Sequence, residues 1–232
     1  MTASRRDVAV VTGASRGVGR AAAVAFAKRG LSVALLGRPS RALDEAAAEV
    51  AALEPGSRPF LCDVSREQDV ERASAEVLAT FGAPRIVVNN AGVVRRGATV
   101  ETTAPSEWDE VIAVNLRGAF LVSHAFVKAM RAAGRGRFVH VSSISATIGC
   151  PGAASYAASK WGLVGLAKSL AEELRGDGLE SIAVLPGSID TDMLVGSGFE
   201  PKMSVDDVAN LIVYAALDAP ASLTGSAIEM FG

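Results

Sequence analysis

The chain has 232 residues, of which 50% are hydrophobic and 21% charged, and its formal net charge is −2. This composition can supply a sizeable core, and the absence of a basic block argues against nucleic acid or an anionic membrane as a partner. The polar start, residues 1–7, lacks the apolar core of a signal peptide, and no apolar run approaches the length of a membrane span. Cys62 and Cys150 lie far apart with no histidine pair nearby. We therefore expect a cytoplasmic protein with reduced thiols and no metal site.

Short apolar runs alternate with longer helical patterns along the whole chain. The first run, residues 8–11, is too brief for a helix and suits a strand that is buried on both faces of a parallel sheet. Strands are predicted over residues 8–11, 31–36, 59–62, 85–88, 137–141, 181–185 and 226–230. Helices are predicted over residues 17–29, 39–53, 66–81, 105–133, 155–174 and 205–217.

This alternation predicts parallel βαβ units with right-handed crossovers, and hence a doubly wound α/β fold of the Rossmann type. The fold would hold a parallel seven-stranded sheet with helices on both faces. No linker or repeat interrupts the pattern, so we expect one domain over residues 1–232. The irregular stretches 89–104 and 186–204 are long for a compact domain, which favours a functional role for both.

A glycine-rich turn lies between the first predicted strand and the first predicted helix. It reads Thr12-Gly13-Ala14-Ser15-Arg16-Gly17-Val18-Gly19. Glycines there allow a tight turn, and they let backbone N–H groups approach a pyrophosphate at the positive end of the helix. The spacing is GxxxGxG and not the common GxGxxG, so the interpretation depends on the position of the turn after the first strand.

The end of the second predicted strand bears on the type of dinucleotide. Proteins of this architecture that bind NAD place Asp or Glu there for the ribose hydroxyls. This chain has Gly37-Arg38 instead, and Arg16 lies in the glycine turn. Because guanidinium groups match phosphate bidentately, two arginines near the adenosine ribose favour a 2′-phosphate and therefore NADP(H).

Tyr156 and Lys160 lie four residues apart, so on a helix they share one face. Free tyrosine has a pKa of about 10. An ammonium about 4 Å away, at an effective dielectric constant near 20, would lower that pKa to about 7. A phenol with such a pKa would be an effective proton donor near neutral pH. Taken alone, a Tyr-x-x-x-Lys pattern is more often a pair of surface side chains, so the rest of the chain has to decide.

Other polar residues allow competing interpretations. His140 and Ser142 suggest serine hydrolysis, but they lie two apart on one predicted strand, and no G-x-S-x-G elbow is present. A histidine on a strand is more often simply packed, and His124, in the long helix, is expected in the core or at an interface. Cys150 either lines a substrate pocket or is an inert thiol.

Further motifs fall at the carboxyl ends of the predicted strands, where doubly wound folds bind ligands. Asn89-Asn90-Ala91-Gly92 follows the fourth strand, and Ser143, thirteen residues before Tyr156, ends the fifth. With these motifs the sequence resembles the short-chain dehydrogenase/reductase family in its single-domain form, over essentially the whole chain. The matching patterns are TGxxxGxG at 12–19, NNAG at 89–92, the serine, YxxxK at 156–160, and PGxxxT at 186–191.

The resemblance implies a role for each matching residue. Tyr156 would donate a proton to a carbonyl, Lys160 would lower the pKa of Tyr156 and hold the nicotinamide ribose, Ser143 would bind the reacting oxygen, and Asn115 would anchor a water relay. The residues implied in cofactor binding, besides Tyr156 and Lys160, are Gly13, Ser15, Arg16, Gly17, Val18, Gly19, Arg38, Asp63, Val64, Asn90, Ala91, Gly92, Pro186, Gly187, Ile189 and Thr191.

The leading hypothesis is therefore an NADPH-dependent reductase of ketones or aldehydes, similar to the 3-oxoacyl-carrier-protein reductases. The alternatives are a dehydrogenase that oxidises an alcohol, sugar or steroid, and a silent NADP(H)-binding regulatory protein. The segment at about 188–204 would form a short lid with an apolar inner surface. The helix predicted over 155–174 is apolar on nearly every side, and the family commonly buries it in a four-helix interface, which implies a homodimer or homotetramer.

Overall fold

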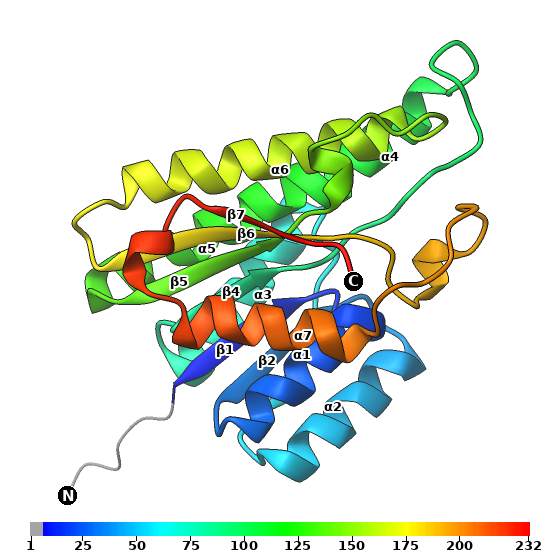
Figure 1. Cartoon of the computed structure of the whole chain (residues 1–232). Helices are drawn as coiled ribbons and strands as arrows, with labels where there is room; N and C mark the ends of the chain where they lie inside the picture. Colours follow the sequence, from blue (N-terminus) through cyan, green and yellow to red (C-terminus); the bar gives the residue numbers. More distant parts are fainter. Residues whose placement is uncertain (1–6) are drawn as a thin grey trace, which may run out of the picture.

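The computed structural model describes residues 7–232, and residues 1–6 of the predicted domain lie outside the described part. Its centre is a seven-stranded parallel sheet in the order β3-β2-β1-β4-β5-β6-β7 (Figure 1). The strands are β1 Val8–Thr12, β2 Ser32–Gly37, β3 Arg58–Leu61, β4 Ile86–Asn89, β5 Gly136–Val141, β6 Leu179–Pro186 and β7 Ala227–Met230. The predicted fold class is therefore confirmed.

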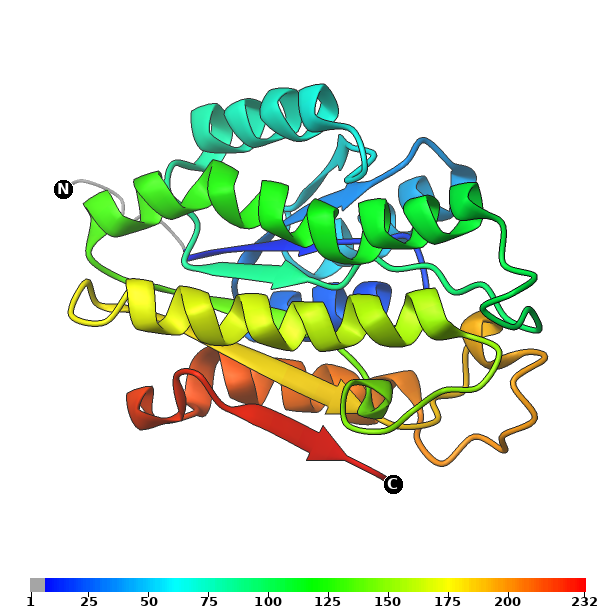
Figure 2. The same cartoon turned by 90° about the horizontal axis from the view of Figure 1, so that it is seen from above.

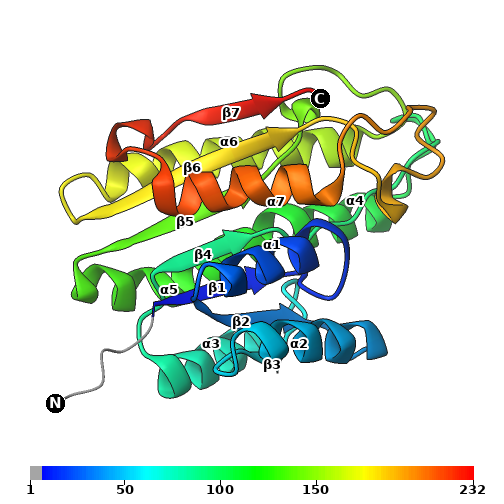
Figure 3. The same ribbon diagram turned by 60° about the horizontal axis from the view of Figure 1, so that its bottom comes forward.

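Helices cover both faces of this sheet. Figure 3 shows α1, α2 and α7 on one face, and Figure 2, from above, shows α3, α5 and α6 on the other. The helices are α1 Gly17–Lys28, α2 Arg41–Leu53, α3 Glu67–Phe81, α4 Pro105–Ile112, α5 Gly118–Ala133, α6 Ala154–Glu173 and α7 Val205–Val213. Short 3₁₀ turns, η2 Ile144–Ala146, η3 Asp192–Leu194 and η5 Ala221–Leu223, follow β5, β6 and α7.

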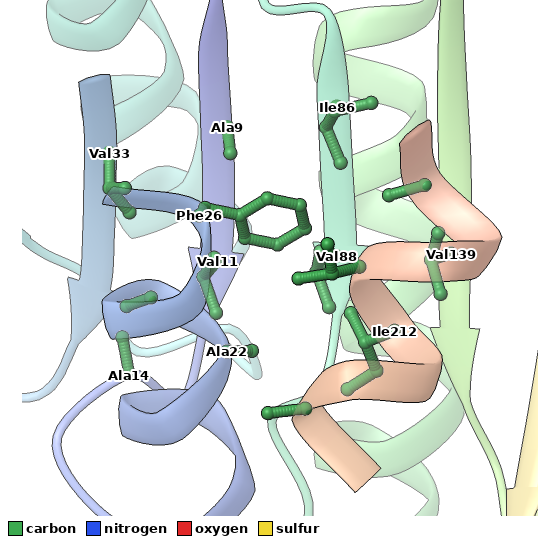
Figure 4. Close-up of a cluster of buried hydrophobic side chains, with 14 of the residues drawn as sticks. Ala9, Val11, Ala14, Ala22, Phe26, Val33, Ile86, Val88, Val139 and Ile212 are labelled. Atoms are coloured by element: carbon green, nitrogen blue, oxygen red, sulfur yellow. The ribbon is translucent and has the colours of Figure 1, made fainter. Parts of the chain in front are cut away.

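The central strands are buried on both faces, as their continuous apolar runs predict. Phe26 of α1 and Ile212 of α7 lie over Val11 and Val88 of the sheet (Figure 4). All four side chains have no exposed surface. Burying a side chain of the size of Phe26 contributes about 1.5–3 kcal/mol, so this contact holds α1 and α7 against the central strands.

The strand order reverses beside β1, because the chain runs from β1 to β2 and β3 on one side and returns to β4 on the other. Such a switch point opens a crevice outside the carboxyl ends of the strands. The turn after β1 and the loop after β4 both leave the sheet at this crevice. The topology therefore brings the glycine turn and the NNAG segment together.

The predicted helix over 105–133 is corrected in one respect. It is α4 and α5 joined by a π-helical turn, η1 Ala113–Arg117, and a second such turn, η4 Tyr214–Asp218, follows α7. Other boundaries differ from those predicted by one or two residues. By length and mean hydropathy Pro105–Ala133 would also suffice to cross a membrane, contrary to the sequence prediction. It packs here against α3 and α6, and 44% of its most apolar window is buried.

Candidate active site

The glycine turn and the NNAG segment hold one another in place. Thr12 Oγ1 donates to the Val88 carbonyl at 3.2 Å and accepts from the backbone N–H groups of Asn90 and Ala91, each at 3.0 Å. The Asn90 side chain donates to the Thr12 carbonyl at 2.9 Å. Thr12 and Asn90 therefore fix the turn on which α1 begins.

Two glycines of the turn have backbone or packing requirements that other residues cannot meet. Gly13 adopts φ 65°, and a Cβ on Gly13 would lie 2.9 Å from the Cα of Ala91. A Cβ on Gly19 would lie 2.3 Å from the Gly13 carbonyl oxygen and 2.5 Å from Asn90 Nδ2. The glycines leave the backbone N–H groups accessible, and the turn leads into the N-terminus of α1, which carries a partial positive charge. The turn therefore fits the phosphates of a dinucleotide.

Replacing Gly19 with alanine is expected to destabilise the fold by about 1–3 kcal/mol, because the new methyl group overpacks this turn. Dinucleotide affinity should fall about tenfold or more, since the Gly13 carbonyl must move. Urea unfolding and fluorescence titration with NADPH measure the two effects. Gly165→Ala on α6 is the control, because a Cβ there meets nothing within 4 Å. A stable Gly19→Ala protein with unchanged affinity would contradict this account of the turn.

The remaining predicted cofactor residues lie around the same crevice. Arg38 directly follows β2 and is exposed, and Val64 is buried beside Gly118. The Asp63 carboxylate accepts from the Ser65 hydroxyl at 2.7 Å and from its N–H at 3.0 Å. Gly92 lies near Lys160 Nζ. The other members, Ser15, Val18, Pro186, Gly187 and Ile189, lie in the glycine turn, at the start of α1 and at the end of β6.

Arg16 makes a contact that the sequence did not predict. Its guanidinium pairs with Asp192 at 2.6 Å, although both side chains are more than 70% exposed. Thr191, the neighbour of Asp192, brings its methyl group to 3.6 Å from the Cβ position of Gly17. The segment after β6 therefore reaches across to the glycine turn, and the cation expected to meet a phosphate is paired within the chain.

The structure brings Tyr156, Lys160 and Ser143 together. Tyr156 and Lys160 lie on α6, Ser143 follows β5, and all three residues are buried. The Lys160 ammonium donates to the Val141 carbonyl at 2.8 Å and lies 5.6 Å from the centre of the Tyr156 ring. Ser143 lies close enough to the Tyr156 phenol to lower its pKa. These groups can bind and protonate one oxygen atom.

The expected pKa near 7 for Tyr156 was wrong for the chain's own groups. Burial raises the pKa of Tyr156 above its ordinary value, while the Ser143 side chain and the charge of Arg96 lower it only in part. Burial also lowers the pKa of Lys160 to about 8. The sequence argument counted the attraction between ammonium and phenolate but omitted the desolvation of both.

Asn115 occupies the π-helical turn and links three segments. Its side chain donates to the Val93 carbonyl at 2.9 Å and to the Ser159 hydroxyl at 3.0 Å, and it accepts from the Val93 N–H at 2.8 Å. Ser159 in turn donates to the Tyr156 carbonyl at 2.7 Å. Asn115 therefore positions both the loop after β4 and the helical turn that carries Tyr156.

Sequence reasoning missed the supporting hydroxyls and the charges on the loops. Ser142 donates to the Lys160 carbonyl at 2.9 Å, which with Ser159 fixes the first turns of α6. Ser159 falls within the YxxxK motif, so its position was the available signal. Arg96 donates to the Met193 carbonyl at 2.5 Å, and no local pattern predicts this contact between residues 97 positions apart.

The geometry around His140 does not fit serine hydrolysis. His140 is fully buried and lies 3.3 Å from Asn89 Nδ2, while Ser142 bonds α6, so the two do not form a nucleophile and its base. Cys150 packs against the cluster that contains Tyr156. Within residues 7–232, no group of three or more His, Cys, Asp or Glu side chains is arranged to hold a metal ion.

The apolar inner surface expected for the segment 188–204 is formed only in part. Met203 is buried and its backbone pairs with Ile189. Val195 is 80% exposed and Phe199 69% exposed, and both point away from the chain's own core. The segment is held instead by polar contacts, from Arg16 to Asp192 and from Arg96 to the Met193 carbonyl.

Comparison with known proteins agrees with this geometry. The family model described as short chain dehydrogenase matches residues 7–199. The chain belongs to the short-chain dehydrogenase family. A 3-oxoacyl-[acyl-carrier-protein] reductase from Synechocystis sp. is 34% identical, over 100% of this chain and 98% of that protein. D-threitol dehydrogenase from Mycolicibacterium smegmatis is 33% identical, over 97% and 91% respectively.

The solved structures agree as well. The crystal structure of levodione reductase superposes with a TM-score of 0.89 at 27% identity, covering 97% of this chain and 95% of that one. As a member of the short-chain dehydrogenase family, the protein is an oxidoreductase that acts on CH–OH groups and uses a nicotinamide dinucleotide.

Proposed function

We propose that this protein is an NADPH-dependent carbonyl reductase, similar to the 3-oxoacyl-carrier-protein reductases, which reduces a ketone or aldehyde to an alcohol. The observation that carries the proposal is that Ser143, Tyr156 and Lys160 are buried together, with the Lys160 ammonium 5.6 Å from the centre of the Tyr156 ring. Full-length similarity to a 3-oxoacyl-[acyl-carrier-protein] reductase supports the reductive direction. The similarity to D-threitol dehydrogenase supports alcohol oxidation as the second candidate.

Each residue would have a separate part in the reduction. When bound, the nicotinamide supplies the hydride. Tyr156 donates the proton to the oxygen on which negative charge develops, and Ser143 donates a hydrogen bond to the same atom. Because both donors are in place before the reaction, they stabilise the transition state more than the ground state. Lys160 would hold the nicotinamide ribose, and Asn115 would anchor a water relay to Lys160.

The cofactor assignment depends on the adenosine end of the crevice. We assign the phosphates to the glycine turn, Gly13 to Gly19, and the 2′-phosphate to Arg38 and Arg16. Asp63 and Val64 would border the adenine, Asn90 to Gly92 would support the ribose side, and the segment Pro186 to Thr191 would meet the carboxamide. Support comes from the bare backbone of the turn and from an arginine where proteins that bind NAD carry an acid.

The test compares affinities for NADPH and NADH in wild type and Arg38→Ala. Wild type should bind NADPH more tightly, and the variant should lose about 10- to 100-fold of that preference, because a charge-assisted hydrogen bond contributes about 1.5–3 kcal/mol. Arg58→Ala is the control. Arg58 is the first residue of β3, at the amino end of the strand and not the carboxyl end where Arg38 lies, and its guanidinium lies over the Phe81 ring. Tighter NADH binding in wild type would overturn the assignment.

A panel of ketones and aldehydes, followed by NADPH absorbance, separates an enzyme from a silent regulatory protein. Turnover of any member supports the reductase, whereas binding without turnover of any carbonyl or alcohol supports the regulatory protein. We also propose a cytoplasmic homodimer or homotetramer in which each chain forms one domain. Phe120 of α5 and Trp161 of α6 are about half exposed, which supports a partner on these helices.

A further inference from the structure

Two adjacent arginines lie in the loop that leaves the carboxyl end of β4, and their surroundings differ. Arg95 is neutralised, because its guanidinium makes three contacts with the Glu110 carboxylate at 2.7, 2.9 and 3.0 Å. This is a bidentate pair of the kind that fixes an arginine on the surface. Arg95 therefore has its anion within the chain.

Arg96 has no such anion. Its side chain makes one hydrogen bond, to the Met193 carbonyl at 2.5 Å, and no ion pair with a carboxylate in the described part of the chain. A guanidinium carries five N–H donors in a planar fork. Arg96 is exposed, so its charge is solvated rather than buried, and most of the fork is available to an acceptor from outside.

The position of Arg96 places this fork at the mouth of the proposed substrate site. The bond to Met193 joins the loop after β4 to the segment after β6, and both segments leave the carboxyl ends of their strands. The positive charge of Arg96 lowers the pKa of the Tyr156 phenol, so the two groups lie within electrostatic reach of one another. Val93, Val94 and Cys150 pack against the buried cluster that contains Tyr156.

The site therefore has hydrogen-bond donors at its inner end, an apolar wall and a cation at its rim. We propose that Arg96 determines specificity by binding an acidic group of the substrate, a carboxylate or a phosphate, carried a few bonds from the carbonyl that Tyr156 protonates. Both anions match the guanidinium fork bidentately. This inference rests on the proposed function, since it names the substrate class of the same site.

Two simpler roles for Arg96 make different predictions. If Arg96 only holds the segment after β6 through Met193, its loss affects charged and neutral substrates equally. The same is true if it acts only on the pKa of Tyr156. A preference for the anionic member of a substrate pair, lost with Arg96, distinguishes binding of the substrate from both.

The experiment uses matched pairs of substrates and the full-length protein with NADPH. Oxo acids with the carbonyl at carbon 2, 3, 4 or 5 are compared with their methyl esters, and dihydroxyacetone phosphate with dihydroxyacetone. Wild type should show kcat/KM about tenfold higher or more for one or more anions than for its neutral partner, mainly through KM. The position of the preferred carbonyl identifies the spacing, and the two series distinguish carboxylate from phosphate.

Three variants assign the preference. Arg96→Gln should reduce the ratio of anionic to neutral kcat/KM to about one, and Arg96→Lys should retain part of it, because the charge remains and the fork does not. Arg95→Gln is the matched control and should keep the wild-type ratio. Equal loss of activity on both members of each pair in Arg96→Gln would overturn the proposal.

Failure of the proposed function has a different signature. If no carbonyl in the panel is reduced, the reductase assignment fails, and the Arg96 proposal is then decided by calorimetric titration of the NADPH-bound protein with the same acids and phosphate. Anion binding that Arg96→Gln abolishes and Arg95→Gln retains would support the proposal. Absence of binding would overturn it.

Discussion

Tyr156→Phe is expected to lower kcat for carbonyl reduction by about 10³-fold while leaving NADPH affinity within about twofold of wild type. A positioned proton donor contributes about 10²–10⁴-fold, and phenylalanine keeps the ring but removes the hydroxyl. The buried ring beside Lys160 is unchanged in shape, so the fold should be retained. Steady-state kinetics and fluorescence titration with NADPH measure the two quantities.

The chain offers a matched control for this substitution. Tyr214, in the π-helical turn after α7, is 43% exposed and lies away from the crevice, so Tyr214→Phe should leave kcat unchanged. Retention of more than about a tenth of wild-type turnover in Tyr156→Phe would mean that the proton comes from another group. Loss of NADPH binding would instead indicate that the phenol serves mainly to hold the cofactor.

Acidification is expected to destabilise this protein through His140. Burial lowers the pKa of His140 to about 4, from about 6.5 in the unfolded chain, so the folded state keeps the ring neutral. The unfolded chain therefore binds a proton that the folded chain does not as pH falls below about 6.5. Stability is lost from about pH 6.5 down to about pH 4, and the full loss is about 3 kcal/mol.

The measurement is urea unfolding at a series of pH values between 7 and 4, for wild type and His140→Leu. Leucine packs differently from histidine, which changes the stability at pH 7, so the quantity compared is the slope of the unfolding free energy with pH. His124 is exposed, and His124→Leu should retain the wild-type slope. Parallel pH profiles for wild type and His140→Leu would show that another group is responsible.

Much of the fold could be predicted because local signals agree with the global pattern. The runs that form β1 and β4 are short, apolar and bounded by Gly13 and by Asn89, so length alone distinguishes them from helices. Tyr156 and Lys160 share a helix face by spacing. The structure brings Ser143 to them because parallel strands end at one sheet edge.

The missed features depend on contacts that are distant in sequence or on solvation. The pairing of Arg16 with Asp192 joins positions 176 residues apart and requires the path of the segment after β6. The pKa of Tyr156 depends on burial, which spacing does not report. No residue type marks the π-helical turn at Asn115 in the sequence, since Leu116 and Val114 fit a regular α-helix equally well.

The π-helical turn η1 rotates the side chains of α5 about the helix axis relative to those of α4. A residue advances an α-helix by about 100°, so one additional residue in a turn rotates everything after it by that amount. The stretch from Pro105 to Ala133 is therefore two amphipathic helices out of phase, of which the first faces α6 through Val111 and the second faces the sheet through Phe126. Deleting one residue between 113 and 117 would bring them into phase, and only one of the two apolar faces would then meet its partner.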